Sequence, residues 1–359
     1  MTAMAVHLSN PLPDAGETRE VAPGVVWVRM PMPFALNHAN LWAIRDPGPA
    51  NSWSLVDAGL KTLDTVNAWR GILTGSGPLG GATISRVIVT HVHADHLGLA
   101  GWITRKFGCR LWMPEREYLQ GCALQAQAGR MAPDDNIRFY RAAGWTDGDL
   151  ETYRAQFGMY GEMIYQIPHS YRRLRDGEWI EIGGHTWQIV TGRGHSPEHA
   201  CLYCPDLKLF LSGDQVLPRI STNVSVLPTE PEADPLGDWL DSIDKIRRTV
   251  PDDVLVLPGH NEPFTGLHAR RDRLASGHAR GLDRLYDLLR QPRRAVDTFG
   301  ALFARDVMAE PELLGLATGE SLAHINYLLM RKDAVVDHIA DGSVWYMRAS
   351  SQDRTGTAA

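Results

Sequence analysis

The most distinctive feature of the sequence is a cluster of three histidines and one aspartate within six residues. Residues 91–96 read His-Val-His-Ala-Asp-His and directly follow the short apolar run 87–89. On a loop that leaves a strand, the first two histidines alternate and can turn toward one metal ion. The aspartate and the third histidine lie on the next turn, within reach of a second ion. Imidazole and carboxylate groups suit zinc, iron or manganese, so the cluster predicts a metal site.

Three more candidate ligands occur later in the chain, each in a loop after a predicted strand. They are His195 in Gly-Arg-Gly-His-Ser-Pro, Asp214 in Leu-Ser-Gly-Asp and His260 in Leu-Pro-Gly-His. Alone, each has an ordinary explanation as a cap, a turn former or a surface histidine. Strand ends gather at one edge of a layered α/β fold, where such folds place their sites. Together with residues 91–96, these residues therefore predict one shared site.

Several neighbouring residues are weaker candidates. His199 follows His195 by four residues, and on a helical turn the two would share a face, so we expect a buried or supporting role. Ser196 has no base beside it and is expected to be structural. The segment after Asp214 offers side chains that could contact substrate or simply hold the loop together: Arg219, Ser221 and Asn223.

The elements that must position these residues can be predicted from apolar patterning. Strand-like runs alternate with windows of helical spacing, which is typical of a layered α/β domain. The helical windows are 61–73 and 267–290, and the predicted strands are 25–28, 41–44, 53–56, 87–89, 187–190, 209–211 and 254–257. The pair Cys201 and Cys204 lies in strand-like sequence, where residues three apart point to opposite faces, so we expect two buried thiols.

Taken together, these segments resemble the metallo-β-lactamase superfamily, over residues 57–260 and including the Asp-Ala-Gly that begins at Asp57. The resemblance implies a four-layer αββα sandwich with a metal site at one edge. It also implies that Asp57 orients a ligand through hydrogen bonds. The implied ligands of the first ion are His91, His93 and His195; those of the second are Asp95, His96 and His260, with Asp214 bridging the two.

The resemblance implies a hydrolase with two divalent ions, zinc first and iron or manganese as alternatives. Such ions lower the pKa of a shared water and supply a hydroxide at neutral pH. Asp95 or Asp214 would move the proton, and no side-chain nucleophile is required. The expected substrate is a small organic thioester, ester or lactone. The alternatives are a ribonuclease or single-strand nuclease, a hydrolytic dehalogenase and a mononuclear iron oxygenase of the same superfamily.

The domain organisation follows from the same patterning. We expect a catalytic domain over 21–266, interrupted by an aromatic-rich helical insertion at about 115–178 that could wall the substrate pocket. The remaining expected parts are an N-terminal arm at 1–20, a connecting helix at 267–295, a small unit at 296–349 and a tail at 350–359.

The unit at 296–349 consists of helical windows followed by a hairpin with Asp-Gly at its turn, and it resembles a winged-helix module. Its net charge is −4, which is wrong for phosphate contact, so packing or homodimer formation fits better than nucleic-acid binding. Residues 267–294 carry a net charge of +5. That stretch is either a solvated helix face or a binding site for an anion such as a coenzyme A phosphate.

Composition excludes several classes of protein. The 359 residues are 44% hydrophobic with a net charge of −6, which fits a folded protein rather than a disordered or generally polyanion-binding one. The 4 cysteines are too few for a disulfide scaffold. No segment approaches the roughly 18 apolar residues of a membrane helix, and no secretory signal precedes the first strand. We therefore expect a cytoplasmic protein with a small-molecule substrate and no membrane partner.

Overall fold

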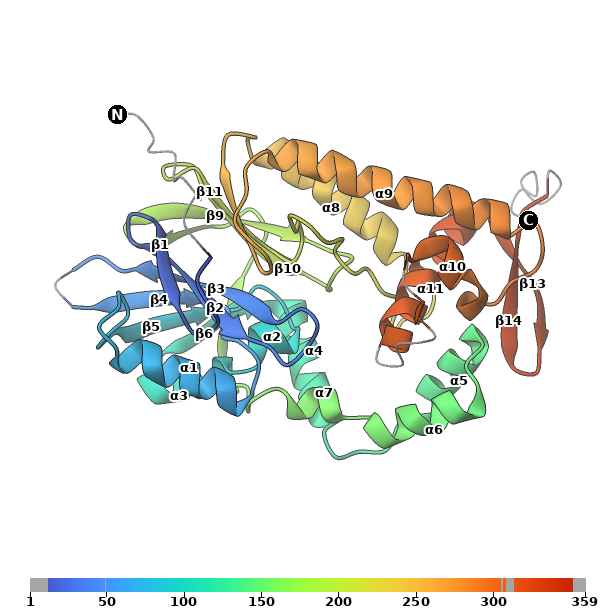
Figure 1. Cartoon of the computed structure of the whole chain (residues 1–359), viewed down its shortest axis with the longest axis horizontal. Helices are drawn as coiled ribbons and strands as arrows, with labels where there is room; N and C mark the ends of the chain where they lie inside the picture. Colours follow the sequence, from blue (N-terminus) through green and yellow to red (C-terminus); the bar gives the residue numbers. More distant parts are fainter. Residues whose placement is uncertain (1–11, 49, 305, 308–312, 351–359) are drawn as a thin grey trace.

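A computed structural model describes residues 12–48, 50–304, 306–307 and 313–350. Its central feature is a pair of sheets (Figure 1), one of seven strands in the order β1-β2-β3-β4-β5-β6-β7 and one of five in the order β12-β11-β10-β9-β8. The first sheet is antiparallel from β1 to β4 and parallel from β4 to β7. In the second, only the β11–β12 pair is parallel. The seven strands are β1 (Thr18–Ala22), β2 (Val25–Pro31), β3 (His38–Arg45), β4 (Ser52–Val56), β5 (Thr83–Ile88), β6 (Arg110–Pro114) and β7 (Tyr171–Leu174); the five are β8 (Trp179–Ile182), β9 (His185–Gly192), β10 (His199–Cys204), β11 (Leu209–Gly213) and β12 (Leu255–Pro258).

Helices cover the outer face of each sheet and make the four layers that the resemblance implies. On the seven-stranded sheet lie α1 (Leu63–Thr74) and α3 (Ala100–Phe107), and on the five-stranded sheet lie α8 (Pro235–Thr249) and α9 (Leu267–Leu288) (Figure 1). Period-2 alternation decides the layering. In β2, Val26 and Val28 face the α1 side, whereas Val25 and Trp27 face the other sheet. The αββα sandwich is thus confirmed.

The space between the two sheets is filled by large apolar side chains from both. Trp27 and Trp42 of the first sheet pack in one cluster with Trp187, Leu202 and Leu211 of the second. The two tryptophan rings stack with centroids 6.0 Å apart. Burial of such side chains stabilises each by roughly 1.5–3 kcal/mol, so this layer fixes the sheets rigidly beneath the loops that leave them.

The predicted helical insertion forms four helices and ends in a strand. The helices are α4 (Glu115–Ala126), α5 (Asp134–Ala143), α6 (Asp147–Gln156) and α7 (Met159–Glu162). Tyr160 of α7 accepts a hydrogen bond from the backbone amide that begins the short helix α2 (Ala94–Leu97). β7 lies within the range predicted to be helical, but it pairs in parallel with β6. Its sequence, Tyr-Arg-Arg-Leu, is short and charged, and Arg172 is held over the ring of Trp112 on β6.

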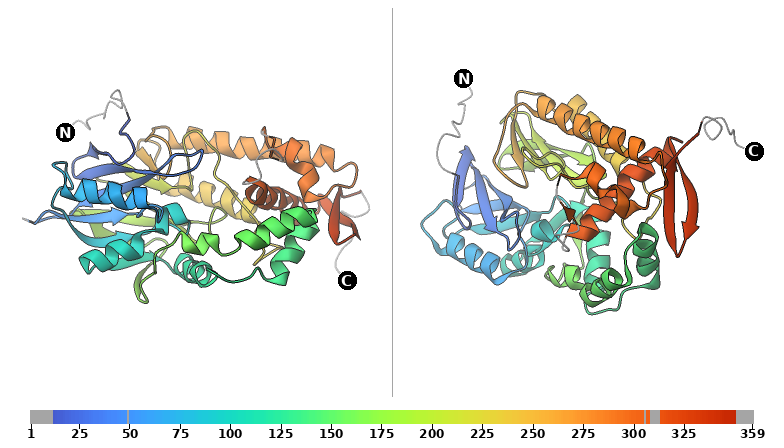
Figure 2. Two further views of the ribbon diagram at one scale, coloured as in Figure 1. Left: turned by 60° about the horizontal axis from the view of Figure 1, so that its bottom comes forward. Right: turned by 45° about the vertical axis from the view of Figure 1, so that its right-hand side comes forward.

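The C-terminal part packs against this insertion at the end of the molecule opposite β1 (Figures 1 and 2). It contains η1 (Ala295–Thr298), α10 (Phe299–Leu302), α11 (Leu314–Met330), β13 (Ala334–Ala340) and β14 (Ser343–Arg348). The hairpin turn at Asp341-Gly342 was predicted, and both residues have positive φ, as its tight turn requires. Trp145 of the insertion donates a hydrogen bond to Thr318 of α11. The winged-helix resemblance of this part stays a prediction.

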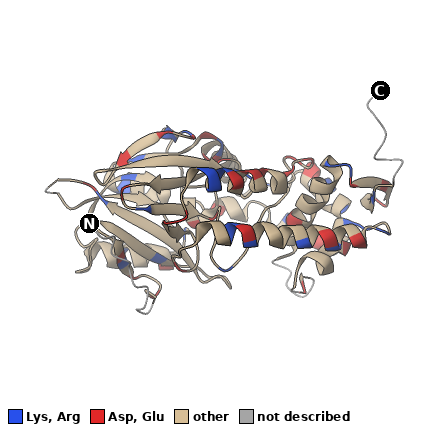
Figure 3. Ribbon diagram, turned by 90° about the horizontal axis from the view of Figure 1, so that it is seen from above, with Lys and Arg blue, Asp and Glu red and all other residues tan. Residues whose placement is uncertain are grey.

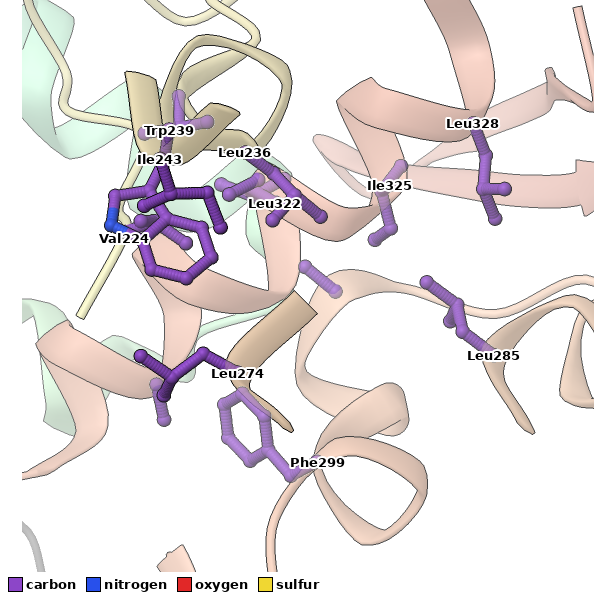
Figure 4. Close-up of a cluster of buried hydrophobic side chains, with 14 of the residues drawn as sticks. Val224, Leu236, Trp239, Ile243, Leu274, Leu285, Phe299, Leu322, Ile325 and Leu328 are labelled. Atoms are coloured by element: carbon purple, nitrogen blue, oxygen red, sulfur yellow. The ribbon is translucent and has the colours of Figure 1, made fainter. Parts of the chain in front are cut away.

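One large apolar cluster joins the helices around the C-terminal part (Figure 4). Trp239 and Ile243 of α8, Leu274 of α9 and Leu322 and Ile325 of α11 are buried in it. The same cluster includes side chains of α5 and α10. The C-terminal elements therefore share their core with the five-stranded sheet.

One sequence prediction needs correction at its boundary, and another lies almost wholly outside the described residues. β1 begins at Thr18, inside the segment 1–20 that was expected to be a loose arm, and residues 1–11 lie outside the described part. The predicted tail 350–359 lies outside it except for residue 350. Cys201 and Cys204 are buried on opposite faces of β10, as predicted. Basic and acidic residues are interspersed over the molecule (Figure 3), and no described helix is long and apolar enough to cross a membrane.

Candidate metal centre

All seven predicted ligands come together where strands of both sheets end. His91 and His93 follow β5, and Asp95 and His96 lie in the short helix α2. The other three follow three strands of the five-stranded sheet: His195 follows β9, Asp214 follows β11 and His260 follows β12. The strand ends of both sheets thus lie at one edge of the sandwich, and residues as far apart in sequence as 91 and 260 come together there.

The first group of donors consists of three histidines. His91 Nε2 lies 3.0 Å from His93 Nδ1 and 3.2 Å from His195 Nε2. Nitrogens held about 2.0–2.1 Å from one tetrahedral ion are separated by about 3.3 Å, so these spacings match ligands of a single ion. His91 is fully buried.

The second group combines two carboxylates and two histidines. Asp95 Oδ2 lies 3.3 Å from His96 Nε2 and 3.2 Å from His260 Nε2. Asp214 reaches both groups, because its Oδ2 is 3.1 Å from His260 Nε2 and 3.7 Å from His195 Nε2. Its position between the groups is the one that a bridging ligand would need.

The hydrogen bonds behind the histidines test whether these groups fit a cation. The Nδ1 atoms of His195 and His260 face the backbone carbonyls of Asn223 and His38, at 2.8 and 2.9 Å. A carbonyl only accepts, so each Nδ1 carries a proton, and in the neutral ring each Nε2 presents a lone pair to the centre. His96 Nδ1 likewise donates to the Asp57 carboxylate at 2.8 Å. Converging lone pairs repel one another unless a cation lies among them, so the donor set fits divalent metal ions.

Two further observations agree with this fit. His96 Nε2 and Asp214 Oδ1 are buried, and neither has a hydrogen-bond partner within the described residues. Buried polar atoms are rarely left unpaired, and an ion would satisfy both. Asp57 also accepts hydrogen bonds from the amide and hydroxyl of Thr90, so its orientation is fixed from two sides.

The electrostatics of the groups control their protonation, on which metal binding depends. Burial, reinforced by neighbouring histidines, holds the pKa of His91 well below its usual value, and burial lowers the pKa of His93 to about 3. Burial opposes the charged forms of Asp95 and Asp214, but the adjacent histidines hold both pKa values well below the ordinary range. The same carboxylates act in the opposite sense on their neighbours: despite burial, they raise the pKa of His260 to about 10 and hold that of His96 well above its usual value. Neutral imidazole and ionised carboxylate are the forms that bind metal, so these two histidines release a proton when an ion binds.

Two glycines let the backbone approach the centre. A Cβ at Gly259 would lie 2.1 Å from Asp214 Oδ1, and a Cβ at Gly213 would lie 2.5 Å from the ring of His199. Gly213 also has a positive φ of 48°. A side chain at either position would push Asp214 or its neighbour out of place, which explains Gly immediately before both Asp214 and His260.

Glu117 is a supporting residue that the sequence reasoning missed. It lies in α4, is fully buried and accepts hydrogen bonds from the Val92 amide at 2.8 Å and the Ser196 hydroxyl at 2.7 Å. The Glu198 amide also donates to it. Burial raises the pKa of this carboxyl to about 7, although the donors favour its charged form. Glu117 therefore ties the loop of His91 and His93 to the loop of His195.

The weaker candidates have defined places. His199 begins β10 rather than lying on a helical turn, and its Nε2 accepts from the Asp214 amide at 3.1 Å, which is a supporting contact. Ser196 donates to Glu117 and has the expected structural role. Arg219 forms an ion pair with Glu262. The Asn223 side chain donates a hydrogen bond to Glu320 at 2.9 Å, and the Asn223 backbone carbonyl accepts one from His195 Nδ1. Ser221 is exposed.

Comparisons with known protein families match two regions of the chain. Residues 36–260 match the model of the metallo-beta-lactamase superfamily, and residues 282–349 match that of a metallo-beta-lactamase-like C-terminal domain. The first region contains all seven convergent residues. Its start at 36 places β1 and β2 outside the matched region.

Curated relatives are similar over most of the chain. A protein of Bacillus subtilis described as "Probable metallo-hydrolase YqjP" is 24% identical over 90% of this chain and 97% of its own length. The "Acyl-coenzyme A thioesterase MBLAC2" of Bos taurus is 25% identical over 72% of this chain and 85% of its own length.

Solved structures extend the similarity to the whole fold. A beta-lactamase domain protein from Burkholderia ambifaria is 39% identical with a TM-score of 0.86, covering 96% of this chain and 98% of that one. A metallo-beta-lactamase family protein from Thermus thermophilus is 26% identical with a TM-score of 0.75, covering 92% of this chain and 100% of that one.

Proposed function

Because the chain belongs to the metallo-beta-lactamase superfamily and is a metallo-hydrolase, we propose that it hydrolyses acyl thioesters with two divalent ions bound. The observation that carries the proposal is the complete convergent donor set, with Asp214 in reach of both groups of ligands. The proposed ligands are those expected from the sequence: His91, His93, Asp95, His96, His195, Asp214 and His260. Zinc is the first candidate because its usual ligands are imidazole and carboxylate.

The ions, when bound, supply Lewis acidity that activates water and polarises a carbonyl oxygen. The residues of the chain hold the donors in place and handle the proton. In hydrolysis, the water oxygen bonds to the carbonyl carbon, the carbon–sulfur bond breaks and the thiolate takes up a proton. Asp95 is the more exposed carboxylate, at 17% against 8% for Asp214. We therefore assign proton transfer from water to thiolate to Asp95, and the role of central ligand to Asp214.

A thioester suits this site better than a bond with a poor leaving group. A thiol has a pKa near 8.5, so its anion leaves without full protonation and the single carboxylate Asp95 suffices. The thioesterase name of the Bos taurus relative, which is similar over 72% of this chain, supports the same substrate class.

The test is a hydrolysis panel on the zinc-loaded protein. The panel contains butyryl-CoA, lactoylglutathione, an aryl ester, a lactone, an activated aryl halide and single-stranded RNA. We expect turnover of thioesters and a loss of at least about a hundredfold in Asp214→Ala. The matched control is Asp206→Ala, an exposed position in the turn between β10 and β11.

Metal analysis tests the dinuclear part separately. Two ions for each wild-type chain, and fewer in Asp214→Ala with an unchanged circular dichroism spectrum, are expected. Full thioesterase activity in Asp214→Ala would contradict the assignment. Turnover of RNA alone would identify the enzyme as a nuclease, and one iron with oxygen consumption would identify it as an oxygenase.

A further inference from the structure

A polar hollow lies outside the candidate metal centre, lined by none of the proposed metal ligands. It has a volume of about 270 Å³ and lies between α9, α11 and the segment that follows Asp214. This volume is below the roughly 300–1,000 Å³ of pockets that enclose a whole ligand, so it fits part of one. Two hydrogen bonds connect it to the centre. Glu320, which lines the hollow, accepts a hydrogen bond from the Asn223 side chain, and the Asn223 carbonyl accepts one from His195 Nδ1.

The wall of the hollow is strongly basic. Four arginines line it, three from α9 and one from the segment after Asp214: Arg270, Arg273, Arg284 and Arg219. We call it the arginine hollow. The first and last of its α9 arginines are separated by fourteen residues, or about 21 Å of helix. The arginine hollow therefore extends along α9.

Most of these arginines are held in place by other contacts. Arg270 donates to the carbonyls of Leu217 and Ile220, and Arg284 donates to that of Ala301. Neutral carbonyls orient a guanidinium group but leave its charge uncompensated. Within the described part of the chain, Arg273 has no ion pair or hydrogen bond. Its charge faces Arg270, whose pKa is lowered by burial and by this neighbour. Two uncompensated like charges side by side favour an anion between them.

Glycines keep the hollow open. Gly277 and Gly281 lie one turn apart inside α9 and both line it. A Cβ at Gly277 would meet nothing within 4 Å, so space rather than crowding surrounds this position. Glycine is a poor residue for a helix interior, and two of them on one face remove side chains that would fill the hollow.

The floor of the hollow contains His278, Glu320 and His324, whose donor atoms lie within 4.8 Å of one another. These residue types can hold a cation, but three guanidinium groups that have no acidic partner within the described residues line the same space and oppose one: those of Arg270, Arg273 and Arg284. The fourth, Arg219, is paired with Glu262.

His278 Nδ1 lies 3.2 Å from His324 Nε2, and the buried His278 Nε2 has no partner among the described residues. Since the Glu320 carbonyl accepts from His324 Nδ1, His278 donates from its own Nδ1 and its Nε2 is a lone pair. The lining holds more guanidinium groups than carboxyl groups, so the balance of charge favours an anionic ligand beside the arginines rather than at this nitrogen.

We propose that the arginine hollow binds a phosphate group of the substrate, and that the natural thioesters are therefore those of coenzyme A. This proposal rests on the proposed function and specifies its substrate. An arm that carries phosphate would lie along α9 with the thioester at the metal centre. Bidentate contacts from guanidinium groups suit phosphate oxygens in number and geometry.

The experiment compares two substrates with the same acyl group. Butyryl-CoA carries phosphate, whereas S-butyryl-N-acetylcysteamine has the same thioester without it. For butyryl-CoA we expect Arg273→Ala to raise KM about tenfold with kcat within about twofold. We expect no change for the second substrate. Gly277→Leu fills the hollow with a better helix former and should act in the same way. Arg280→Ala is the matched control, an exposed arginine of α9 outside the hollow.

Equal KM values for butyryl-CoA in Arg273→Ala, Arg280→Ala and wild type would overturn the phosphate subsite while leaving the thioesterase function intact. Failure of wild type to hydrolyse either thioester would overturn the proposed function instead. Titration calorimetry with free coenzyme A and with inorganic phosphate measures binding to the hollow independently of hydrolysis. Binding of phosphate alone would refute the coenzyme A assignment. A third zinc per chain that disappears in Glu320→Gln would refute an anion site.

Discussion

Asp57→Asn tests how the protonation of a ligand is controlled from behind the centre. In the wild type, Asp57 Oδ2 accepts the Nδ1 proton of His96 at 2.8 Å, which leaves Nε2 of the neutral ring as the lone pair that would bind the metal. The substituted amide keeps the shape of the side chain and can still accept the Thr90 amide through its oxygen. Its NH₂ group then faces His96 Nδ1 and donates to it. The His96 proton moves to Nε2, toward Asp95 Oδ2 at 3.3 Å.

The expected magnitude follows from the loss of one ligand in only one of the two groups. Replacing a residue that orients a metal ligand raises the dissociation constant of the metal about 10–100-fold, or about 1.4–2.7 kcal/mol. The ion of the Asp95–His96–His260 group should weaken by this amount. The ion of the first group should bind as before, because the hydrogen bond of His91 Nδ1 is to Thr90 Oγ1 rather than to Asp57.

The assay is a competition titration of zinc against a chromophoric chelator, which resolves two binding steps. Asp46→Asn is the matched control, since Asp46 accepts hydroxyl hydrogen bonds from Ser54 and Ser85 at the opposite end of β4. Both steps should keep their wild-type affinity in this control. If Asp57→Asn also keeps both affinities, the tautomer of His96 does not depend on Asp57, and the reasoning from the hydrogen-bond partners is refuted.

Three further predictions concern the same centre and the arginine hollow. At pH 8, Glu117→Gln should lower kcat/KM about 10–100-fold, because one backbone amide of the two ligand loops loses its hydrogen-bond acceptor. The control is Glu115→Gln, which changes a half-exposed carboxyl of α4 and should keep kcat/KM within about twofold of the wild-type value. Burial and then His324 lower the pKa of His278 to about 4, so the unfolded chain takes up this proton first as pH falls. The free energy of unfolding should therefore drop by about 3 kcal/mol more in wild type than in His278→Asn between pH 6.5 and 4, measured by urea titration. With free zinc at about a hundred times its Kd, bound zinc should add about 3 kcal/mol to the free energy of unfolding. Differential scanning calorimetry should show this stabilisation lost when a chelator removes the zinc and regained when zinc is added back.

The ligand set could be predicted because its signal is local. Four of its members lie within residues 91–96, and the others each follow a short apolar run and a glycine. Strand ends meet at one edge of a sandwich, so the sequence order of strands and polar loops already implies convergence. The layers could be predicted for the same reason, because period-2 and helical apolar patterns alternate along the chain.

The supporting contacts could not be predicted because they depend on tertiary packing. Glu117 has the sequence context of a surface residue in a charged helix, and only the docking of α4 under two loops buries it. Asn223 acts on His195 through its backbone carbonyl, which no side-chain pattern reveals. β7 was missed because a four-residue edge strand with two arginines lacks strand periodicity, and its pairing comes from β6.

The packing of the insertion on the C-terminal elements affects how the nascent chain can fold. Trp145 donates a hydrogen bond to Thr318, which is translated 173 residues later. The carbonyl of Arg141 accepts one from the hydroxyl of Ser343, which is translated 202 residues later. Proteins fold from the N-terminus as they are synthesised, and contacts of such long sequence separation form last. The metal ligands are complete once His260 has been translated, but the core that supports the insertion is not. A chain truncated before α11 would thus hold its ligands beside an unsupported apolar surface, a species prone to aggregation during expression.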